Sequence, residues 1–379
     1  MSKKIGTKCV HSGNIVDDKF HGSISPIYPA TTYDYRKTDT YPRYFNTPNQ
    51  LALSKKISDL ESAEDSILFG SGLGAVSSTM FSFLKSGDHV ILHDSIYGGT
   101  INLVNTEFKK FNIDFSYIDI NDVDLLKSTI KKNTRIIYFE TPTNPLLQII
   151  DISLISSVAK ENDIISIIDN TFASPINQNP INFGIDLVIH SATKYLGGHS
   201  DILAGSVSGA KEHVEKIKKS GINYGASLSD YTVWLLERSI KTLSVRVNAQ
   251  NQNALDLANF LYESSLIKKV YYPGLENHFS HEIASKQMNG FGGMMSFEVM
   301  DKINPEDFVS DLKIISPTMS LAGVESSITS PSKTSHKKVD FQIRKKLGIS
   351  DNLLRFSVGI EDIKDLMLDL DKSLKNNVR

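Results

Sequence analysis

The chain has 379 residues, more than one hydrophobic core usually organises, so we expect a large and a smaller domain. Its 41 basic residues (Lys and Arg) nearly balance 43 acidic ones, and the formal charge of -2 argues against nucleic acid as the main partner. Cys9 is the only cysteine, which excludes an internal disulfide and argues against a zinc-thiolate site; we expect no metal. No apolar run has the length of a signal peptide or a membrane span, so we expect a cytoplasmic protein without a membrane partner.

The first half of the chain predicts an arm followed by an alternating α/β domain. Residues 1–46 lack sustained periodicity and combine prolines with tyrosines, so we expect a non-helical arm that contacts another subunit. From about Gln50 a helical pattern begins, and short apolar runs then alternate with helical stretches. We expect strands at 66–69, 89–93, 115–118, 135–139, 164–168 and 187–190, one more at 203–208, and a helix at 74–84. This alternation is typical of βαβ units and predicts the α/β class with a mainly parallel sheet.

Long helical patterns replace the alternation after residue 236. We place a boundary near residue 244, which gives an arm (1–46), a large domain (47–244) and a small C-terminal α/β domain (245–379). Strands near Val270 and at 294–299 would belong to the small domain.

The stretch 186–199 follows a buried strand with residues that favour chemistry. The apolar run at 187–189 leads into Ser191, Thr193 and Lys194. Partial burial at the mouth of a strand disfavours the ammonium form of a lysine and leaves an amine that can form a Schiff base. In an extended segment the hydroxyls of Ser191 and Thr193 would point the same way and bind an anion beside the lysine. The simpler interpretation is a surface lysine after a strand.

Residues 70–75 read Gly-Ser-Gly-Leu-Gly-Ala, between a predicted strand and a predicted helix. Glycines there let backbone N–H groups approach a phosphate at the positive end of the helix dipole. The same residues satisfy a loose dinucleotide fingerprint, with Asp94 after the next strand as a ribose-binding acid. A nicotinamide-dependent oxidoreductase is therefore a rival, and a turn without function is a third interpretation.

Asp169 ends the apolar run 164–168, at the position where open α/β sheets bind ligands. Taken alone, it would equally serve as a cap for the following turn. With Lys194 and the glycine loop it completes the set that pyridoxal phosphate requires. That set is a lysine for the imine, a phosphate cradle, and a carboxylate that keeps the pyridine nitrogen protonated. A dinucleotide would give Lys194 no comparable role.

Longer motifs connect these residues to a known family. They are Ser-Ala-Thr-Lys-Tyr-Leu-Gly-Gly-His at 191–199, Tyr-Gly-Gly-Thr at 97–100, Glu-Thr-Pro-Thr-Asn-Pro at 140–145 and Ser-Leu-Ala-Gly-Val-Glu-Ser at 320–326. Nearly end to end, the chain resembles the Cys/Met-metabolism family of pyridoxal-phosphate enzymes. This group includes cystathionine γ-synthase, cystathionine β- and γ-lyase and methionine γ-lyase. The resemblance implies the fold-type I architecture, similar to aspartate aminotransferase, and a homotetramer of two tight dimers with active sites shared between subunits.

The resemblance also implies roles for matching residues. Lys194 would form the Schiff base with the cofactor and then move protons. Asp169 would pair with the pyridinium, and Tyr97 would stack on the ring and act as acid or base toward the substrate. Asn144 would hydrogen-bond near the cofactor's phenolic oxygen and beside the substrate.

Phosphate and substrate binding are implied for residues in several segments. The phosphate ligands would be the N–H groups of Gly72 and Leu73, the hydroxyls of Ser191 and Thr193, and Tyr41 and Arg43 from the neighbouring subunit. Arg355, helped by Ser320, would bind the substrate's α-carboxylate. Taken singly, such tyrosines would be packing residues, such an arginine a surface ion pair and such a serine a turn residue; within the motifs we assign them to the site.

Three features depart from the family's usual residues. Thr47-Pro48 inverts the usual order in the arm and leaves its local path open. Gly99 stands where methionine γ-lyases commonly carry a cysteine, which argues against that activity. Met319 stands where γ-synthases and many γ-lyases place a glutamate for the distal ammonium of cystathionine. Methionine offers that ammonium no counter-charge, which favours a lyase of the cystathionine β-lyase kind over a synthase.

We therefore predict a carbon–sulfur lyase that acts on sulfur amino acids of the cystathionine class, a β-lyase or β/γ-lyase. Within the family the alternatives are cystathionine γ-synthase and an O-acylhomoserine sulfhydrylase. Outside this chemistry the alternatives are the nicotinamide oxidoreductase and a non-catalytic relative.

Overall fold

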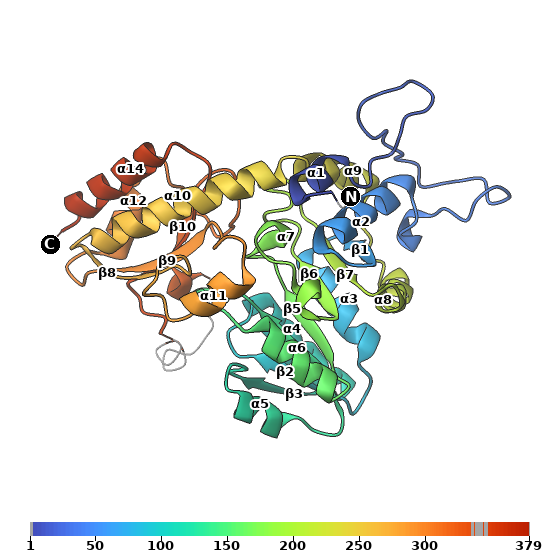
Figure 1. The fold of residues 1–379 in the computed structure, drawn as a ribbon, viewed down its shortest axis with the longest axis horizontal. Coiled ribbons are helices and arrows are strands. Elements are labelled where there is room, and N and C mark those ends of the chain that lie inside the picture. The colour runs from blue at the N-terminus through green and yellow to red at the C-terminus, as the bar shows by residue number, and fades with distance from the viewer. Residues whose placement is uncertain (1–2, 335–336, 338–343, 345–347, 379) are drawn as a thin grey trace. The chain divides into compact units, whose positions relative to one another are not determined.

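The computed structural model describes residues 3–334, 337, 344 and 348–378, and the chain divides into two compact units, both drawn in Figure 1. The first unit contains residues 1–140, 151–197 and 201–244. The second contains residues 141–150, 198–200 and 245–379. The three-part division expected from the sequence places residues 141–150 and 198–200 in the large domain, whereas here they belong to the second unit.

A seven-stranded sheet forms the centre of the first unit (Figure 1). Its strands are β1 (Asp65–Phe69), β2 (His89–His93), β3 (Asp114–Ile118), β4 (Thr134–Glu140), β5 (Ile165–Asp169), β6 (Leu187–His190) and β7 (Gly205–Gly209). They lie in the order β1-β7-β6-β5-β4-β2-β3, and only β7 runs against its neighbours. The predicted α/β class with a mainly parallel sheet is confirmed, and each expected strand ends within two residues of its predicted bounds.

Helices cover this sheet. They are α1 (Ile5–His11), α2 (Pro48–Glu61), α3 (Gly72–Phe83), α4 (Gly98–Glu107), α5 (Val123–Thr129), α6 (Ile152–Glu161), α7 (Ser174–Asn177), α8 (Lys211–Tyr224) and α9 (Asp230–Ile240), with 3-10 turns η1 (Pro42–Tyr44), η2 (Phe108–Phe111) and η3 (Pro180–Phe183). Buried apolar side chains of α3, α4 and α8 join those of the sheet in one core. The helix predicted from Gln50 begins at Pro48, because Thr47 and Gln50 form a capping box and proline suits the first helical position. The inverted Thr47-Pro48 order is thus a helix start.

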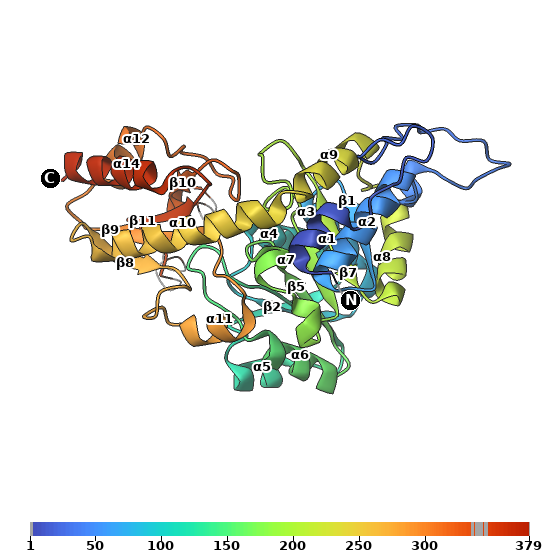
Figure 2. The same ribbon diagram turned by 45° about the horizontal axis from the view of Figure 1, so that its top comes forward.

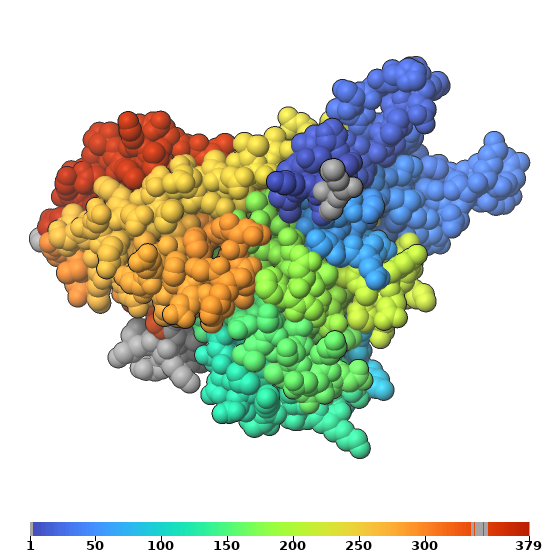
Figure 3. Space-filling model, viewed as in Figure 1, coloured from blue at the N-terminus to red at the C-terminus, as the bar shows by residue number. Residues whose placement is uncertain are grey.

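The sequence predicted a non-helical arm before α2, but part of the arm is helical. Residues Ile5–His11 form α1, which buries Cys9, and Lys8 Nζ donates to the Asp59 carbonyl of α2 at 2.8 Å. Seven residues are too few to give a periodic signal. Apart from η1, the rest of the arm forms loops that extend from the first unit (Figures 1 and 3), and they expose apolar side chains such as Phe20 (77%) and Tyr35 (88%).

The second unit has an antiparallel sheet in the order β10-β11-β9-β8. Its elements are β8 (Ile267–Tyr271), β9 (Met294–Val299), β10 (Ser327–Thr329), β11 (Leu353–Ser357), α10 (Leu243–Glu263), α11 (His281–Gln287), α12 (Pro305–Asp311), η4 (Pro331–Lys333) and α14 (Ile363–Asn376). Figure 2 shows the long α10 alongside β8. Along α14, Leu366, Leu370 and Leu374 form the buried stripe that a helix on a core requires. Among the described helices none has both the length and the apolar character to cross a membrane.

Candidate active site

Two carboxylates end neighbouring strands of the large sheet. β4 ends at Glu140 and β5 at Asp169, and these two residues are partners in the parallel register. β6 pairs with β5 and ends at His190, directly before the segment that carries Lys194. Because the carboxyl ends of parallel strands meet at one edge of a sheet, the acid and the lysine segment leave adjacent strands at the same edge.

A single threonine binds the Asp169 carboxylate twice. Thr171 donates to Asp169 Oδ1 through its hydroxyl at 2.5 Å and through its backbone N–H at 3.0 Å. Burial raises the pKa of Asp169, while the Thr171 hydrogen bonds and the nearby His190 oppose that rise. The backbone bond is the turn cap that the sequence offered as an alternative role. The same donors favour the ionised acid, which is the form that a pyridinium partner requires.

Thr171 also joins Asp169 to the lysine segment. Its hydroxyl oxygen accepts the N–H of Ser191 at 2.8 Å, and the Ser191 carbonyl accepts the N–H of Lys194 at 3.0 Å. Lys194 is half-buried. Sequence reasoning missed Thr171, although a hydroxyl two residues after a strand-ending aspartate is a usable signal, because it reaches back to the carboxylate.

Residues 192–197 form a turn, so the extended conformation predicted for this segment is wrong. The bond from the Lys194 N–H to Ser191 closes the turn. The Thr193 hydroxyl faces Ala204, donating to its carbonyl at 3.1 Å and accepting from its N–H at 3.0 Å. Strand alternation therefore does not align the two hydroxyls, and phosphate binding by Thr193 stays a prediction.

The glycine loop opens α3 as a tightly packed turn. Ser71 is the N-cap and accepts the N–H of Gly74 at 2.9 Å, while the N–H groups of Gly72 and Leu73 have no carbonyl to bond within the helix. A Cβ on Gly72 would lie 2.7 Å from the Ser191 Cβ, so glycine is required where this helix end meets the lysine segment. Two backbone donors at the start of a 12-residue helix, with the Ser191 side chain beside them, fit a phosphate group.

Tyr97 is the N-cap residue of α4 and is tied to Glu140. Its backbone N–H donates to Glu140 Oε1 at 2.7 Å, and its side chain is 52% exposed. A Cβ at Gly99 would lie 2.3 Å from Tyr97 Cε1, so the ring fills the space that a side chain at position 99 would need. The residue at position 99 therefore determines the room available to the Tyr97 ring.

Tyr41 and Arg43 lie exposed on the arm. The Arg43 guanidinium donates to the Ile222 carbonyl at 2.8 Å. It also lies over the Tyr41 and Tyr44 rings, 5.6 and 5.3 Å from their centroids. Binding of a neighbouring subunit's cofactor by Tyr41 and Arg43 stays a prediction.

In the second unit, Arg355 of β11 is a buried cation held by neutral groups. It is 5% exposed, and its guanidinium donates to Asn144 Oδ1 at 3.2 Å and to the Met319 carbonyl at 3.0 Å. Burial lowers the pKa of Arg355 to about 10, and no carboxylate of the described chain opposes this shift. Ser320 and the Met319 side chain are exposed. A buried guanidinium without a counter-ion is destabilising, and a carboxylate fits its fork of donors.

A second pair of buried ionisable side chains lies at the end of β6. Glu61 of α2 and His190 of β6 share a short hydrogen bond, and Asn170 donates to the same Glu61 oxygen at 3.5 Å. Glu61 and His190 are both buried, and His190 lowers the pKa of Asp169. The sequence analysis missed this pair because the partners are 129 residues apart.

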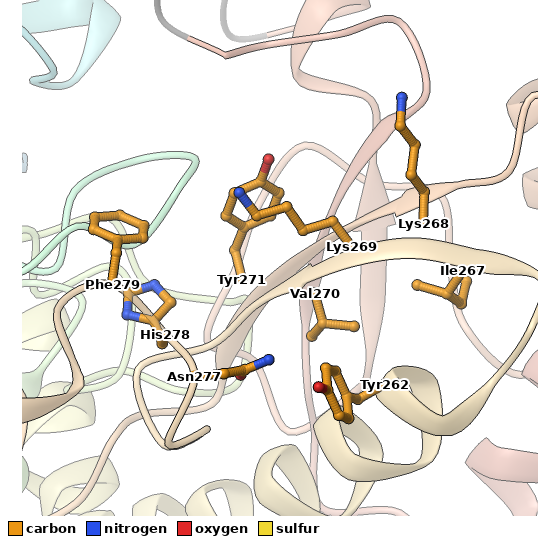
Figure 4. A pocket seen from close by; sticks show the side chains of 9 residues that line it. All are labelled: Tyr262, Ile267, Lys268, Lys269, Val270, Tyr271, Asn277, His278 and Phe279. Atoms are coloured by element: carbon orange, nitrogen blue, oxygen red, sulfur yellow. The ribbon is translucent and has the colours of Figure 1, made fainter.

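A cavity of about 290 Å³ opens elsewhere, on the second unit (Figure 4). It is lined by Tyr262, Ile267, Lys268, Lys269, Val270, Tyr271, Asn277, His278 and Phe279. None of the residues predicted for the site lines it. In the parts of the chain that the structure describes, no three His, Cys, Asp or Glu residues are grouped so as to hold a metal ion.

The fold and these groups together define a class of protein. A mostly parallel seven-stranded sheet, a helix opened by glycine, a strand-ending aspartate and a lysine after the next strand are the parts of a fold-type I pyridoxal-phosphate enzyme. The chain belongs to the family of Cys/Met metabolism PLP-dependent enzymes, whose model matches residues 6–375.

Relatives match the chain over its whole length. It is 44% identical to the cystathionine β-lyase of Lactococcus lactis subsp. cremoris, covering 98% of this chain and 99% of that one. It is 40% identical to the cystathionine γ-lyase of Bacillus subtilis, covering 99% and 100%. The crystal structure of cystathionine γ-lyase from Lactobacillus plantarum complexed with L-serine superposes with a TM-score of 0.94 at 39% identity, covering 98% and 99%. The predicted family, fold type and cofactor are confirmed, and the nicotinamide oxidoreductase is set aside.

Proposed function

We propose that this chain cleaves cystathionine by β-elimination, so that cystathionine and water give homocysteine, pyruvate and ammonia. The observation that carries the proposal is Arg355, a buried cation without a carboxylate partner among the described residues, in a family of amino-acid enzymes. The relative named cystathionine β-lyase, at 44% identity, supports the choice of reaction.

Lys194 and Asp169 carry the central chemistry in this proposal. Pyridoxal phosphate, when bound, draws electrons from the amino acid's Cα and so makes its proton acidic. The Lys194 amine takes that proton, since it also holds the cofactor and is therefore close to Cα, and the homocysteine sulfur gains a proton as its bond to Cβ breaks. Asp169 keeps the cofactor's ring nitrogen protonated. The Thr171 hydroxyl donates to Asp169 and so stabilises the ionised carboxylate of Asp169.

Other groups of the first unit hold the cofactor. The N–H groups of Gly72 and Leu73 bind the phosphate, with hydroxyls from Ser191 and Thr193. For Thr193 this requires its hydroxyl to leave the Ala204 carbonyl. Tyr97 packs on the ring and serves as acid or base toward the substrate. Tyr41 and Arg43 complete the phosphate ligands from a neighbouring subunit.

Arg355 and residues near it bind the substrate. Arg355 takes the α-carboxylate through two parallel N–H bonds, helped by Ser320 and Asn144. Met319 is 72% exposed and has no charge to offer the distal ammonium of cystathionine. This residue favours a lyase over a γ-synthase.

A γ-lyase is the second candidate, because the relatives from Bacillus subtilis and Lactobacillus plantarum carry that name. γ-Elimination needs a further proton transfer at Cβ, which the same Lys194 amine would perform. Cystathionine γ-synthase and O-acylhomoserine sulfhydrylase remain the alternatives of the replacement type.

Product analysis separates these reactions. Protein loaded with pyridoxal phosphate is given cystathionine, and separately O-succinylhomoserine with cysteine. We expect homocysteine and pyruvate from cystathionine, and none from Lys194→Ala. Cysteine with 2-oxobutyrate would identify a γ-lyase instead, and net cystathionine formation would identify a synthase.

We also propose a homotetramer of two dimers that share active sites. Support comes from the arm, which exposes Phe20 and Tyr35 and carries Tyr41 and Arg43. Light scattering should find four chains, and a monomer that is active would contradict the shared site.

The proposed compartment is the cytoplasm, where a lone cysteine stays reduced; cell fractionation tests it.

A further inference from the structure

Glu140 is a buried carboxyl group for which the proposed reaction has no role. It is 6% exposed at the end of β4, and it is the register partner of Asp169 on β5. Adjacent residues of parallel strands direct their side chains to the same face of a sheet. The two carboxyl groups therefore lie side by side.

Glu140 also fixes the start of α4. The Tyr97 N–H donates to Glu140 Oε1 at 2.7 Å, and the Tyr97 carbonyl accepts the first helical N–H, from Ile101, at 3.0 Å. The Tyr97 side chain makes no capping hydrogen bond to this helix. The backbone at Tyr97 is thus held by a residue of a neighbouring strand rather than by its own loop.

Two ionised carboxylates side by side in a buried site repel each other, so the pair retains one proton. The groups that act on its ionisation are Tyr138 on β4, His190 on β6, whose ring shares a hydrogen bond with Glu61, and the Tyr97 N–H before α4. The ionised form of Asp169 is stabilised by two hydrogen bonds from Thr171 and by the nearby His190, whereas that of Glu140 is stabilised by one hydrogen bond, from the Tyr97 N–H. Burial and then Asp169 raise the pKa of Glu140 well above its usual range.

We propose that Glu140 is a positioning residue that carries the proton of the Glu140–Asp169 pair, holds the Tyr97 backbone through Oε1 and leaves Asp169 as the pair's single negative charge. This inference rests on the proposed function, in which Asp169 and Tyr97 serve the cofactor. A single negative charge matches the single positive charge of a protonated ring nitrogen, and a second carboxylate charge would exceed it.

Glutamine reproduces the shape and neutrality of a protonated glutamate, so Glu140→Gln and Glu140→Ala separate charge from contact. In the cofactor-free full chain, hydrogen exchange at the Tyr97 amide should be about tenfold faster in Glu140→Ala, because its N–H loses the acceptor, and within about twofold of wild type in Glu140→Gln. The dissociation constant of pyridoxal phosphate should rise about tenfold in Glu140→Ala and stay within about threefold in Glu140→Gln.

An infrared difference spectrum tests the proton itself. Wild type minus Glu140→Gln, without cofactor at neutral pH, should show the carbonyl band of a protonated carboxylic acid. Glu298→Gln is the matched control, since Glu298 is a buried glutamate that accepts from the Tyr271 hydroxyl at 2.9 Å. It should leave Tyr97 exchange unchanged.

Three results would overturn the proposal: an ionised-carboxylate band in place of the acid band, a Glu140→Gln variant as impaired as Glu140→Ala, or unchanged Tyr97 exchange in Glu140→Ala. Exchange and infrared spectra are measured without cofactor, so they decide the state of Glu140 even if the chain fails to cleave cystathionine. Failure of the proposed function is thereby told apart from failure of this inference.

Discussion

Replacing Thr171 by valine tests how the site positions its acid and its lysine. The change removes one hydroxyl and keeps the shape of the side chain. That hydroxyl donates to Asp169 at 2.5 Å and accepts the Ser191 N–H at 2.8 Å. With valine at position 171, Asp169 loses a hydrogen-bond donor and the Ser191 N–H loses its acceptor.

Each loss has a known scale. A hydrogen bond to a charged acceptor contributes about 1.5–3 kcal/mol, and a buried N–H without a partner costs about 1–3 kcal/mol. The first loss acts on cofactor binding, so we expect the affinity for pyridoxal phosphate to fall about tenfold to a hundredfold. The second acts with or without cofactor, so we expect the free energy of unfolding of the cofactor-free chain to fall by about 1–3 kcal/mol.

The effect has a pH dependence with a definite sign. The hydrogen bond from the Thr171 hydroxyl lowers the pKa of Asp169, so its loss raises that pKa, although the backbone bond from residue 171 remains. The valine variant should bind the cofactor least well, relative to wild type, as the pH falls through the raised pKa, and should recover part of the deficit at higher pH.

Absorbance titration with pyridoxal phosphate at several pH values measures both effects. Thr171→Ser is the control, because it keeps the hydroxyl and should bind nearly as wild type. A serine variant as weak as the valine variant, or a valine deficit independent of pH, would refute the role assigned to the hydroxyl.

Three further changes test other parts of the site. Arg355→Lys keeps the charge and loses the two-pronged contact, so KM for cystathionine should rise about tenfold with cofactor affinity unchanged; steady-state kinetics with an unaltered KM would count against carboxylate binding. Gly99→Ala puts a Cβ 2.3 Å from Tyr97 Cε1 and should displace that exposed ring, altering the circular dichroism of bound cofactor without unfolding the chain. Gly6→Ala, with 3.7 Å of clearance, is its control, and identical spectra for the two variants would exclude the displacement. Burial raises the folded-state pKa of Glu140, so its contribution to stability is complete below the unfolded pKa of about 4.3 and is lost as pH rises through the folded pKa. Urea unfolding of the cofactor-free chain should therefore show Glu140→Gln gaining on wild type as pH rises, and parallel pH curves would contradict this.

The parallel strands were predictable because burial on both faces makes them continuous apolar runs. In β2 and β6 every residue is buried, so the signal needs no knowledge of tertiary contacts. Asp169 and Lys194 follow such runs, and their chemistry is conspicuous there. The local sequence was therefore sufficient to predict the strands of the sheet and the two polar residues, Asp169 and Lys194, that follow them.

Other features depend on contacts that local sequence does not encode. The turn at 192–197 is stabilised in part by Ala204, and the extended prediction for the segment took no account of that contact. Glu140 becomes notable only when β4 lies beside β5. The helix α1 buries only Cys9, which leaves no periodic pattern to detect.

Lys194 is the residue on which the proposed chemistry depends, and its attachment to the cofactor can be measured directly. Protein loaded with pyridoxal phosphate is reduced with borohydride, digested and mapped by mass spectrometry. We expect the pyridoxyl group on the peptide that contains Lys194, and none in Lys194→Ala. Lys56 is a stringent comparison, because burial lowers its pKa to about 8. A pyridoxyl group on Lys56 or on any other lysine, with Lys194 unmodified, would contradict the assignment.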